Sequence, residues 1–464
     1  MTKYDSIIYY YNFEFGHYYC MDFDFDCLRH CMVDRPRGKR KRRLNELFIM
    51  LDTETSKSEE DHYTTDKHGK KQYAENINYI VKWSIGINIW GFNLGVIWGN
   101  TPWELCECIQ QIHGHLNGNA TIFYCHNWSY DNIFLRKFLF KQFGFPMNQL
   151  STKPHYPVCT EFENGVQIRD SLILAQRSLE RWGADMHVQH AKAIGKWDYN
   201  RIRHQQDTMT DDEMLYICND VLCGVECLDA LRRANRKTYA GIPYTATGFV
   251  RNEARVRGGN LFAHKRARQC YSTYDNYLMC ESVYHGGYTH ANRNFLSHVI
   301  DEETIYCFDF ASKYPACMLM YKFPCEAFTE DDASMDEILK YSDTDAYIFT
   351  FKATGVKLKN YWFGMPVIQT SKCNYIVDGI SDNGRILEAA FVEINITDVD
   401  LKMYLQYYDF AEIQITNVLR AAKEYIPRWL SDYVYELFKA KTQLKGVDDV
   451  LYAIAKAHLN SIYG

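Results

Sequence analysis

The chain has 464 residues, which is enough for more than one hydrophobic core. No run approaches 18 apolar residues, and Met1 is followed by polar and aromatic residues, which excludes a membrane-spanning helix and a secretory signal, so we expect an intracellular protein that is not secreted. The formal net charge of −6 gives no global sign of nucleic-acid binding, but basic clusters at 35–43 and 251–268 predict local phosphate contacts or solvated loops.

The predicted elements begin after a tyrosine-rich N-terminal extension, residues 1–43. Apolar runs, caps and glycines then predict three strands, a helix, a strand, a helix, a further strand and a long amphipathic helix, at residues 47–55, 81–90, 94–99, 101–116, 120–127, 129–144, 165–174 and 211–237. This is the element order of a ribonuclease-H-like α/β core. We therefore expect the first domain to cover residues 44–240.

The remaining sequence is less regular at first, and residues 241–300 are expected to be a linker. The following pattern predicts a strand, a short helix, a strand and, after a mixed region of loops at about 357–424, two helices joined by a glycine turn, at residues 304–310, 315–322, 346–353, 425–446 and 450–464. We therefore expect an α+β domain over residues 301–464.

Acidic residues of the first domain form a candidate metal site. Asp52 and Glu54 lie two apart at the end of a buried strand, so their side chains share a face, and Asp131 begins a helix just after another strand. Tyr216 and Asp220 stand at i, i+4 on the long helix. Four such carboxylates could hold two divalent cations, Mg²⁺ or Mn²⁺, for phosphodiester hydrolysis, with Tyr216 orienting the attacking water. Taken alone, each of these acidic residues is also explained as a helix cap or a structural acid.

Three segments around these acids carry a resemblance to a known family. The segments "LDTET", "HNWSYDNIF" and "YICND" resemble, in order, the three exonuclease motifs of family B DNA polymerases with 3'-5' proofreading, in the branch that has a tyrosine in the third motif. The resemblance implies that the four carboxylates are metal ligands. It also implies a strip that grips a frayed single-stranded end, formed by Thr55, His126, Asn127 and Tyr130.

A second site is implied by "CFDFASKYPACM", which resembles motif A of the same family. In that resemblance Asp309 binds both catalytic metal ions, the backbone near Ser312 and Lys313 holds triphosphate oxygens, and Tyr314 packs under the sugar. Without the resemblance, Asp309 is a strand-end residue in a turn. Lys313 departs from the apolar residue that is usual in the motif, which leaves the details of the turn open.

The C-terminal segment "KAHLNSIYG" resembles motif B of the family. Lys456, Asn460 and Tyr463 stand at i, i+4 and i+7, so we expect them to share one helical face. The resemblance implies that Lys456 contacts phosphates and that Asn460 and Tyr463 contact the incoming nucleotide and its base pair. Lys441, on the preceding predicted helix, resembles a second phosphate-contacting lysine more loosely.

Two further segments favour the protein-primed branch of the family. "YHGGY" resembles its Y-x-G-G motif, which implies DNA contacts by Tyr284, Gly286 and Gly287, although a plain glycine turn also explains it. The segment "VEINITDVDLKMYLQYYDF" resembles the insertion between motifs A and B that marks protein-primed phage and viral polymerases. The resemblance therefore implies a terminal, or priming, protein as a partner.

The family's motif C, Y-x-D-T-D, is expected after motif B. "YSDTDAYIF" at 341–349 contains Asp343 and Asp345, but it lies between motifs A and B and follows a helix-like segment, so we interpret it as a loop that enters a strand and keep a catalytic pair as the alternative. The resemblance therefore implies a truncated or split polymerase, in which residues 301–464 form an incomplete domain with a palm that carries motif A, the insertion at about 357–424 and fingers that carry motif B. Motif C and the thumb are expected to be absent, with a second polypeptide as a possible source of both.

The combined interpretation is a protein-primed family B DNA polymerase with 3'-5' exonuclease activity. The expected partners are single-stranded 3' ends and primer-template DNA, deoxynucleotides and the terminal protein, without a membrane, and the place of action is the host cytoplasm if the protein is viral. Two alternatives stay open at this point. One is a stand-alone 3'-5' DNA exonuclease, and the other is a non-catalytic module for DNA binding or priming.

Overall fold

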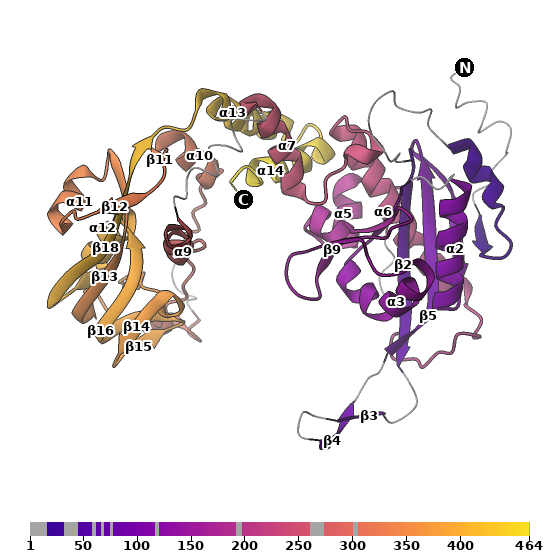
Figure 1. Ribbon diagram of the computed structural model, residues 1–464, viewed down its shortest axis with the longest axis horizontal. Coiled ribbons are helices and arrows are strands. Elements are labelled where there is room, and N and C mark those ends of the chain that lie inside the picture. The colour runs from indigo at the N-terminus through magenta and orange to yellow at the C-terminus, as the bar shows by residue number, and fades with distance from the viewer. Residues whose placement is uncertain are drawn as a thin grey trace. The chain divides into compact units, whose positions relative to one another are not determined.

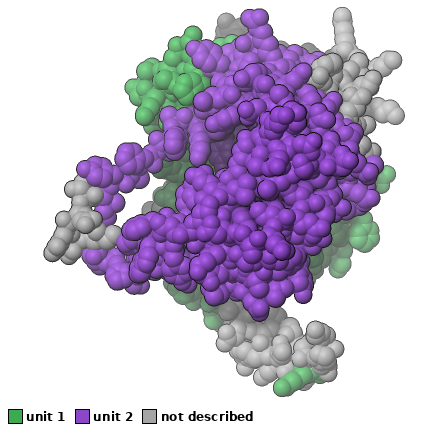
Figure 2. Space-filling view, turned by 90° about the vertical axis from the view of Figure 1, so that its left-hand side faces the viewer, with its two compact units in different colours: residues 1–251, 437–462, 464 green, residues 252–436, 463 purple. Residues whose placement is uncertain are grey.

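The computed structural model divides the chain into two compact units (Figure 2). Unit 1 contains residues 1–251, 437–462 and 464, and unit 2 contains residues 252–436 and 463. Each unit has its own large sheet (Figure 1). The structure describes residues 16–31, 45–57, 62–65, 69–74, 78–116, 120–191, 197–259, 273–299 and 305–463.

Unit 1 is built on an eight-stranded mixed sheet. Its strand order is β1-β6-β5-β2-β7-β10-β9-β8, where β1 is His17–Tyr19, β2 Phe48–Lys57, β5 Asn78–Ile89, β6 Phe92–Gly99, β7 Thr121–Cys125, β8 Asn148–Ser151, β9 Pro157–Glu161 and β10 Val166–Asp170. The pairs β1/β6, β2/β7 and β7/β10 are parallel, and the other pairs are antiparallel. A separate two-stranded sheet pairs β3 (His62–Thr65) with β4 (Lys71–Ala74).

Helices cover both faces of the unit 1 sheet (Figure 1). Strand β2 is buried on both sides because Ile49 and Leu51 belong to the core under α2 (Pro102–His115) and α3 (Trp128–Phe143), whereas Phe48 and Met50 belong to the core on the other face. That second face is covered by α4 (Ser171–Ala175), α5 (Leu179–Met186), α6 (Asp211–Ala234) and, near the C-terminus, α14 (Asp449–Asn460). The sheet is therefore the middle layer of a three-layer unit.

Unit 2 contains an antiparallel sheet whose core is formed by three long strands. These are β13 (Asp345–Leu358), β16 (Arg385–Thr397) and β18 (Glu412–Glu424). Shorter strands extend the sheet: β11 (Phe323–Pro324), β12 (Thr329–Asp331), β14 (Cys373–Val377), β15 (Ile380–Asp382) and β17 (Tyr408–Asp409). The helices of this region are α9 (Tyr274–Val283), α10 (Lys313–Met320), α11 (Met335–Tyr341) and α12 (Asp398–Tyr407), while α7 (Ala246–Gly258) and α13 (Arg428–Leu444) contribute residues to both units.

Several sequence expectations differ from the structure. The N-terminal extension contributes β1 and the short helix η1 (Phe25–Cys31), and residues 357–424 form the long strands of unit 2 instead of mainly loops. Residues 305–310 were expected in a strand but have no regular secondary structure. Helix α14 ends at Asn460, so Tyr463 lies beyond it and does not share its face. The basic cluster at 35–43 lies outside the described residues.

The same structure bears on the membrane prediction. None of its described helices combines the length and the apolar character needed to cross a bilayer.

Candidate active site

Three carboxylates meet where β2 contacts α6. Oxygen atoms of Asp52, Glu54 and Asp220 all lie within 4.8 Å of one another, and we call these three residues the carboxylate trio. Strand alternation places Asp52 and Glu54 on the same face as Phe48 and Met50, which is the face that α6 covers. Glu54 and Asp220 are almost fully buried. Three acids held this close repel one another, so the arrangement suits divalent cations with oxygen ligands.

Two glycines allow α6 to lie close to the sheet at this point. A Cβ atom at Gly224, one turn beyond Asp220, would lie 2.7 Å from Cε of Met50, and one at Gly86 on β5 would lie 3.0 Å from a methyl carbon of Val221. Both distances are too short for ordinary packing. The glycines therefore bring the Asp220 carboxylate within reach of the strand-borne pair.

Two tyrosine hydroxyls lie beside the trio. Tyr199 Oη donates a hydrogen bond to Oε2 of Glu54 at 3.2 Å and lies 3.3 Å from Oη of Tyr216. Desolvation raises the pKa of each phenol well above its usual value, and the neighbouring carboxylates, Glu54 for Tyr199 and Asp220 for Tyr216, raise it further. Both hydroxyls therefore stay protonated at neutral pH. Tyr216 was predicted from its spacing to Asp220, whereas sequence reasoning missed Tyr199.

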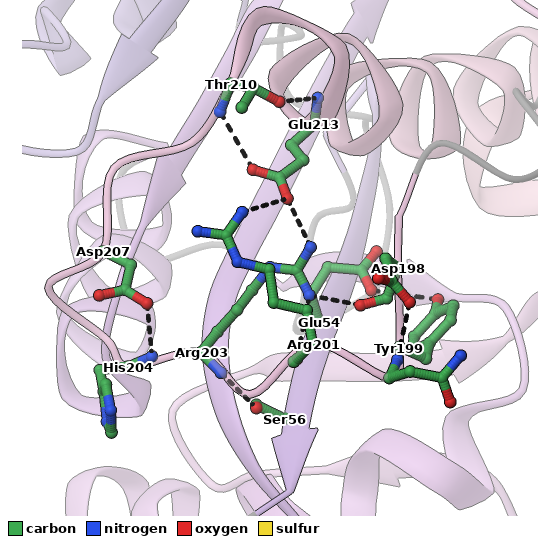
Figure 3. A network of polar contacts seen from close by, with 11 residues as sticks. Glu54, Ser56, Asp198, Tyr199, Arg201, Arg203, His204, Asp207, Thr210 and Glu213 are labelled. Atoms are coloured by element: carbon green, nitrogen blue, oxygen red, sulfur yellow. Dashed lines mark hydrogen bonds and ion pairs between the residues drawn. The ribbon is translucent and has the colours of Figure 1, made fainter.

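A loop of residues 197–210 holds Tyr199 in place (Figure 3). Its anchor is Arg203, whose buried guanidinium bonds to the carboxylate of Glu213 and lies 4.4 Å from the Trp197 ring. The Arg203 backbone N–H donates to Oγ of Ser56 at 2.8 Å. Its carbonyl accepts from the hydroxyl of Tyr79. The loop is thereby fixed to β2, β5 and the first turn of α6.

Glu213 has two roles at the start of α6. It closes a capping box with Thr210, and it receives the Arg203 guanidinium (Figure 3). Burial works against its ionisation, but the hydrogen bonds from Arg203 and from the cap outweigh burial and lower the pKa of Glu213. No periodic pattern marks Arg203 or Tyr199 in the sequence, which explains why neither was predicted.

The fourth predicted carboxylate, Asp131, lies outside the trio. It is buried at the start of α3, where Oδ1 accepts from the Thr53 hydroxyl at 2.5 Å and Oδ2 accepts from the Cys125 thiol at 3.2 Å. Thr53 points to the α3 face of β2, opposite to Asp52 and Glu54. Burial raises the pKa of Asp131 to about 6. A metal-ligand role for Asp131 stays a prediction.

The residues predicted to grip a DNA end fall into two groups. Thr55 Oγ1 and Tyr130 Oη lie 3.0 Å apart beside the trio, and the Tyr130 ring is 40% exposed. Asn127 is exposed and has a left-handed backbone, with its side-chain oxygen accepting from the Ser129 hydroxyl. His126 instead contacts the Ser171 hydroxyl and the carbonyl of Arg177, both at 3.1 Å, which is a structural environment.

The predicted motif A residues belong to unit 2. Asp309 is exposed, and among the described residues the trio is the only group of three or more potential metal ligands. Ser312 has a left-handed backbone and begins α10, and the Lys313 ammonium lies 5.1 Å from the Phe310 ring centre. The Tyr314 ring stacks on Tyr463 with centroids 4.6 Å apart. The structure therefore brings together two of the predicted nucleotide-binding residues, Tyr314 and Tyr463.

The predicted motif B residues Lys456 and Asn460 belong to unit 1. They line a groove of about 580 Å³ between α14 and α5, whose other side contains Arg177, Arg181 and Asp185. The two arginines are paired with Asp185. Lys441 lies on α13 and is partly exposed.

The Y-x-G-G segment approaches the motif A turn within unit 2. Tyr284 is exposed, Gly286 has open space around it, and a Cβ atom at Gly287 would lie 2.9 Å from Oη of Tyr314. Only glycine fits at residue 287 without displacing that hydroxyl.

The segment at 341–349 enters a strand, as the sequence indicated, because β13 begins at Asp345. Asp345 pairs with Arg420 at 2.9 Å, and Asp343 is exposed and lies 3.9 Å from Lys402. Both acids therefore have basic partners within unit 2.

Comparison with known proteins finds a family match for the second part of the chain. Residues 271–464 match the family of DNA polymerases of type B, organellar and viral. No curated protein sequence matches the chain.

Solved structures of one type B DNA polymerase have a similar fold. Phi29 DNA polymerase complexed with single-stranded DNA superposes with a TM-score of 0.67 at 17% identity, over 90% of this chain and 67% of that one. Its complex with primer-template DNA gives 0.68 at 18% identity, over 90% and 67% of the two chains. Its complex with primer-template DNA and incoming nucleotides gives 0.63 at 17% identity, over 92% and 68%. The chain thus spans about two thirds of that polymerase.

The two comparisons cover different parts of the chain. The family match begins at residue 271, so it contains the predicted motif A and motif B residues but not the carboxylate trio. The structural similarity covers most of the chain, but at this identity it establishes the fold alone. The interpretation of the trio therefore rests on its geometry.

Proposed function

We propose that unit 1 contains a 3'-5' exonuclease with a ribonuclease-H-like core, which removes nucleotides from single-stranded DNA ends. The observation that carries this proposal is the convergence of Asp52, Glu54 and Asp220 within 4.8 Å, from a strand and a helix far apart in sequence. Two tyrosine hydroxyls border the same carboxylates, and the exposed Tyr130 ring contacts Thr55, the residue after Glu54. This is a site with acids for metal ions, phenols that donate hydrogen bonds, and a surface for a base.

The trio would hold divalent cations, Mg²⁺ or Mn²⁺, in a two-ion site with Asp131 as a possible fourth ligand. When bound, such ions lower the pKa of a coordinated water and stabilise the leaving oxygen of the cleaved phosphodiester. Tyr199 keeps the Glu54 carboxylate oriented through its hydrogen bond. Tyr216, protonated at neutral pH, donates a hydrogen bond that orients the attacking water. Thr55 and Tyr130 hold the terminal nucleotide, since an aromatic ring stacks on a base of any sequence.

We also propose that the chain acts in viral DNA replication as part of a protein-primed polymerase. The support is the family match over 271–464, which contains every residue predicted for polymerisation. In this proposal Asp309 is a catalytic metal ligand. Deoxynucleotide contacts are proposed for Ser312, Lys313, Tyr314, Lys441, Lys456, Asn460 and Tyr463, and DNA contacts for Tyr284, Gly286 and Gly287. A terminal protein, and a second polypeptide with motif C and the thumb, stay predictions.

The exonuclease proposal is tested with the purified chain and a 5'-labelled single-stranded oligonucleotide. We expect stepwise shortening from the 3' end in Mg²⁺, no shortening in excess chelator, and loss of activity in the double variant Asp52→Ala, Glu54→Ala. Asp343→Ala, which removes an exposed carboxylate of unit 2, is the control and should keep full activity. Metal-independent binding without turnover would favour the non-catalytic alternative. Equal activity in the double variant and the parent would refute the exonuclease assignment.

A further inference from the structure

An aromatic groove lies between α2, α3 and β5 in unit 1. It has a volume of about 440 Å³ and is bordered by the start of β5, the start of α2 and one face of α3. Its walls include Trp103, Ile133, Phe134 and Phe138, together with Lys137, and none of the described residues that line it is acidic. The predicted exonuclease residues do not include any of these side chains.

The exposed residues of α3 form a continuous stripe along the groove. Tyr130, Ile133, Lys137 and Lys141 are exposed and recur at spacings of three or four, so they occupy one side of the helix. Eleven residues separate the first from the last, a rise of roughly 16 Å along the helix axis. A stripe of this length accommodates more than one nucleotide. Its aromatic and basic composition differs from that of a buried helix face.

Aromatic rings and ammonium groups are combined at the far end of the stripe. Trp103 and Phe138 meet edge to face with centroids 4.9 Å apart. The Lys141 ammonium lies 5.5 Å from the Trp103 ring centre, and the Lys137 ammonium lies 4.9 Å from that of Phe138. The Trp103 side chain is 44% exposed. Exposed rings beside cations provide a stacking surface for bases and charge for phosphates.

The groove is connected to β2, the strand that carries Asp52 and Glu54. Thr55 contacts the Tyr130 hydroxyl, and the Tyr130 ring meets Phe134 edge to face at 5.2 Å. From the other side, Tyr79 and Ile80 of β5 line the groove and pair with Ser56 and Thr55 of β2. The α3 side and the β5 side of the groove therefore each contact β2 within two residues of Glu54.

We propose that this groove binds a single nucleic-acid strand upstream of the nucleotide that lies at the trio. A base stacks on Trp103 and Phe138, and Lys137 and Lys141 contact successive phosphates. The direction of the strand rests on the proposed exonuclease function, because it assumes that the 3' end lies at the trio. The binding itself requires only the aromatic rings and the lysines.

Binding is measured on the whole chain in chelator, so that no cleavage occurs. The probes are a fluorescent trinucleotide of thymidylate and a fluorescent strand of about twelve thymidylates. Trp103→Ala should weaken binding of the longer strand about fivefold or more, the loss of one stacked base, and leave the trinucleotide unchanged. Lys137→Ala with Lys141→Ala should reduce the slope of log affinity against log salt by about 1.4, which is about 0.7 for each phosphate contact.

A matched control lies elsewhere on unit 1. Lys153 is an exposed lysine whose ammonium lies 4.0 Å from the exposed Tyr156 ring, outside the groove. Lys153→Ala with Tyr156→Ala removes the same chemistry and should change neither affinity nor salt slope. Thermal unfolding of each variant shows whether its fold is intact. The two lysine replacements are at exposed positions and keep the test informative if Trp103→Ala is unstable.

The outcomes separate this proposal from the exonuclease proposal. Loss of the length-dependent affinity in the groove variants, with the trinucleotide unaffected, supports the groove whether or not cleavage occurs in Mg²⁺. Wild-type affinities and salt slopes in all groove variants would overturn it, even if the exonuclease activity is present. If those variants instead lose binding to a protein partner and keep DNA affinity, the groove is a protein-docking surface and the proposal is wrong.

Discussion

The carboxylate trio of unit 1 and the motif A turn of unit 2 differ in how far their structure prepares them for metal binding. In unit 1, a strand and a helix bring three acids together, and two neutral phenols border them. The loop of residues 197–210, held by the ion pair between Arg203 and Glu213, fixes one of these phenols. In unit 2, Asp309 is exposed in an irregular segment, apart from any described group of three potential ligands. The comparison teaches that a motif specifies residue types, whereas a preorganised metal site needs a second element that supplies opposing carboxylates.

The largest expected effect comes from replacing one acid in each region. Asp220→Asn should reduce Mg²⁺-dependent degradation of single-stranded DNA on the order of 10³-fold, because it removes a charged ligand from the trio. Asp309→Asn should leave this rate unchanged. The measurement is the initial rate of nucleotide release from a labelled oligonucleotide. A comparable loss in both variants would refute the distinction between the two regions, since it would show that nuclease activity depends on Asp309.

The second expected effect concerns the ion pair between Arg203 and Glu213, which fixes the loop that carries Tyr199. Arg203→Ala should lower the free energy of unfolding of unit 1 by about 3 kcal/mol, because it leaves Glu213 buried and charged without its partner. Urea unfolding followed by tryptophan fluorescence measures the change.

Arg201→Ala is the matched control for the loss of the ion pair between Arg203 and Glu213. Arg201 belongs to the same loop and lies 3.9 Å from the same carboxylate, but its side chain is 54% exposed. Its loss should cost less than about 1 kcal/mol. Equal costs for the two arginines would mean that the buried ion pair does not stabilise the loop.

The third expected effect tests which region α14 belongs to. His458 on α14 is half-buried beside Phe249 of unit 1, and this partial burial lowers its pKa from 6.5 to about 4. Because the folded state excludes the charged form, the unfolded chain takes up a proton first as pH falls from 6.5 towards 4, and stability is lost over that range. The loss between pH 7 and pH 5 should be about 2 kcal/mol.

Urea unfolding at the two pH values checks this prediction. His458→Gln cannot titrate, so the difference in its unfolding free energy between pH 7 and pH 5 should be about 2 kcal/mol smaller than that of the parent chain. Because the difference between the two pH values is measured within each protein, the comparison is valid even if His458→Gln is itself destabilising. An unchanged pH dependence would show that His458 is accessible to protons and that α14 is not packed into the unit 1 core.

The sequence predicted the elements of unit 1 well because their signals are local. The apolar run before Asp52 marks β2, and the threonine caps with glutamate three residues later mark the starts of α2 and α6. Strand alternation, helix spacing and the order of the elements then predicted that Asp52, Glu54, Asp131, Tyr216 and Asp220 would meet. The structure confirms the convergence of the three acids.

The parts that were missed depend on contacts between distant residues. Tyr199 reaches Glu54 only because Arg203 is held by Glu213, and no spacing rule encodes such a loop. Asp131 was expected with the other acids, but it is hydrogen-bonded to Thr53 and Cys125 and does not belong to the trio. In unit 2, apolar alternation between residues 357 and 424 is interrupted by bulges and turns, so its long strands were interpreted as mixed loops.

The smallest expected effect concerns the hydroxyl of Tyr199, which the loop of residues 197–210 places against Glu54. Tyr199→Phe keeps the ring and removes one hydrogen bond to a charged carboxylate, so cleavage should slow about tenfold at saturating Mg²⁺. Because the two phenols contact each other, Tyr199→Phe should cost less in a Tyr216→Phe background than alone. Rates of the four proteins in this cycle measure the coupling. Additive effects would mean that the hydroxyls act separately, and that preorganisation of the trio does not extend to this loop.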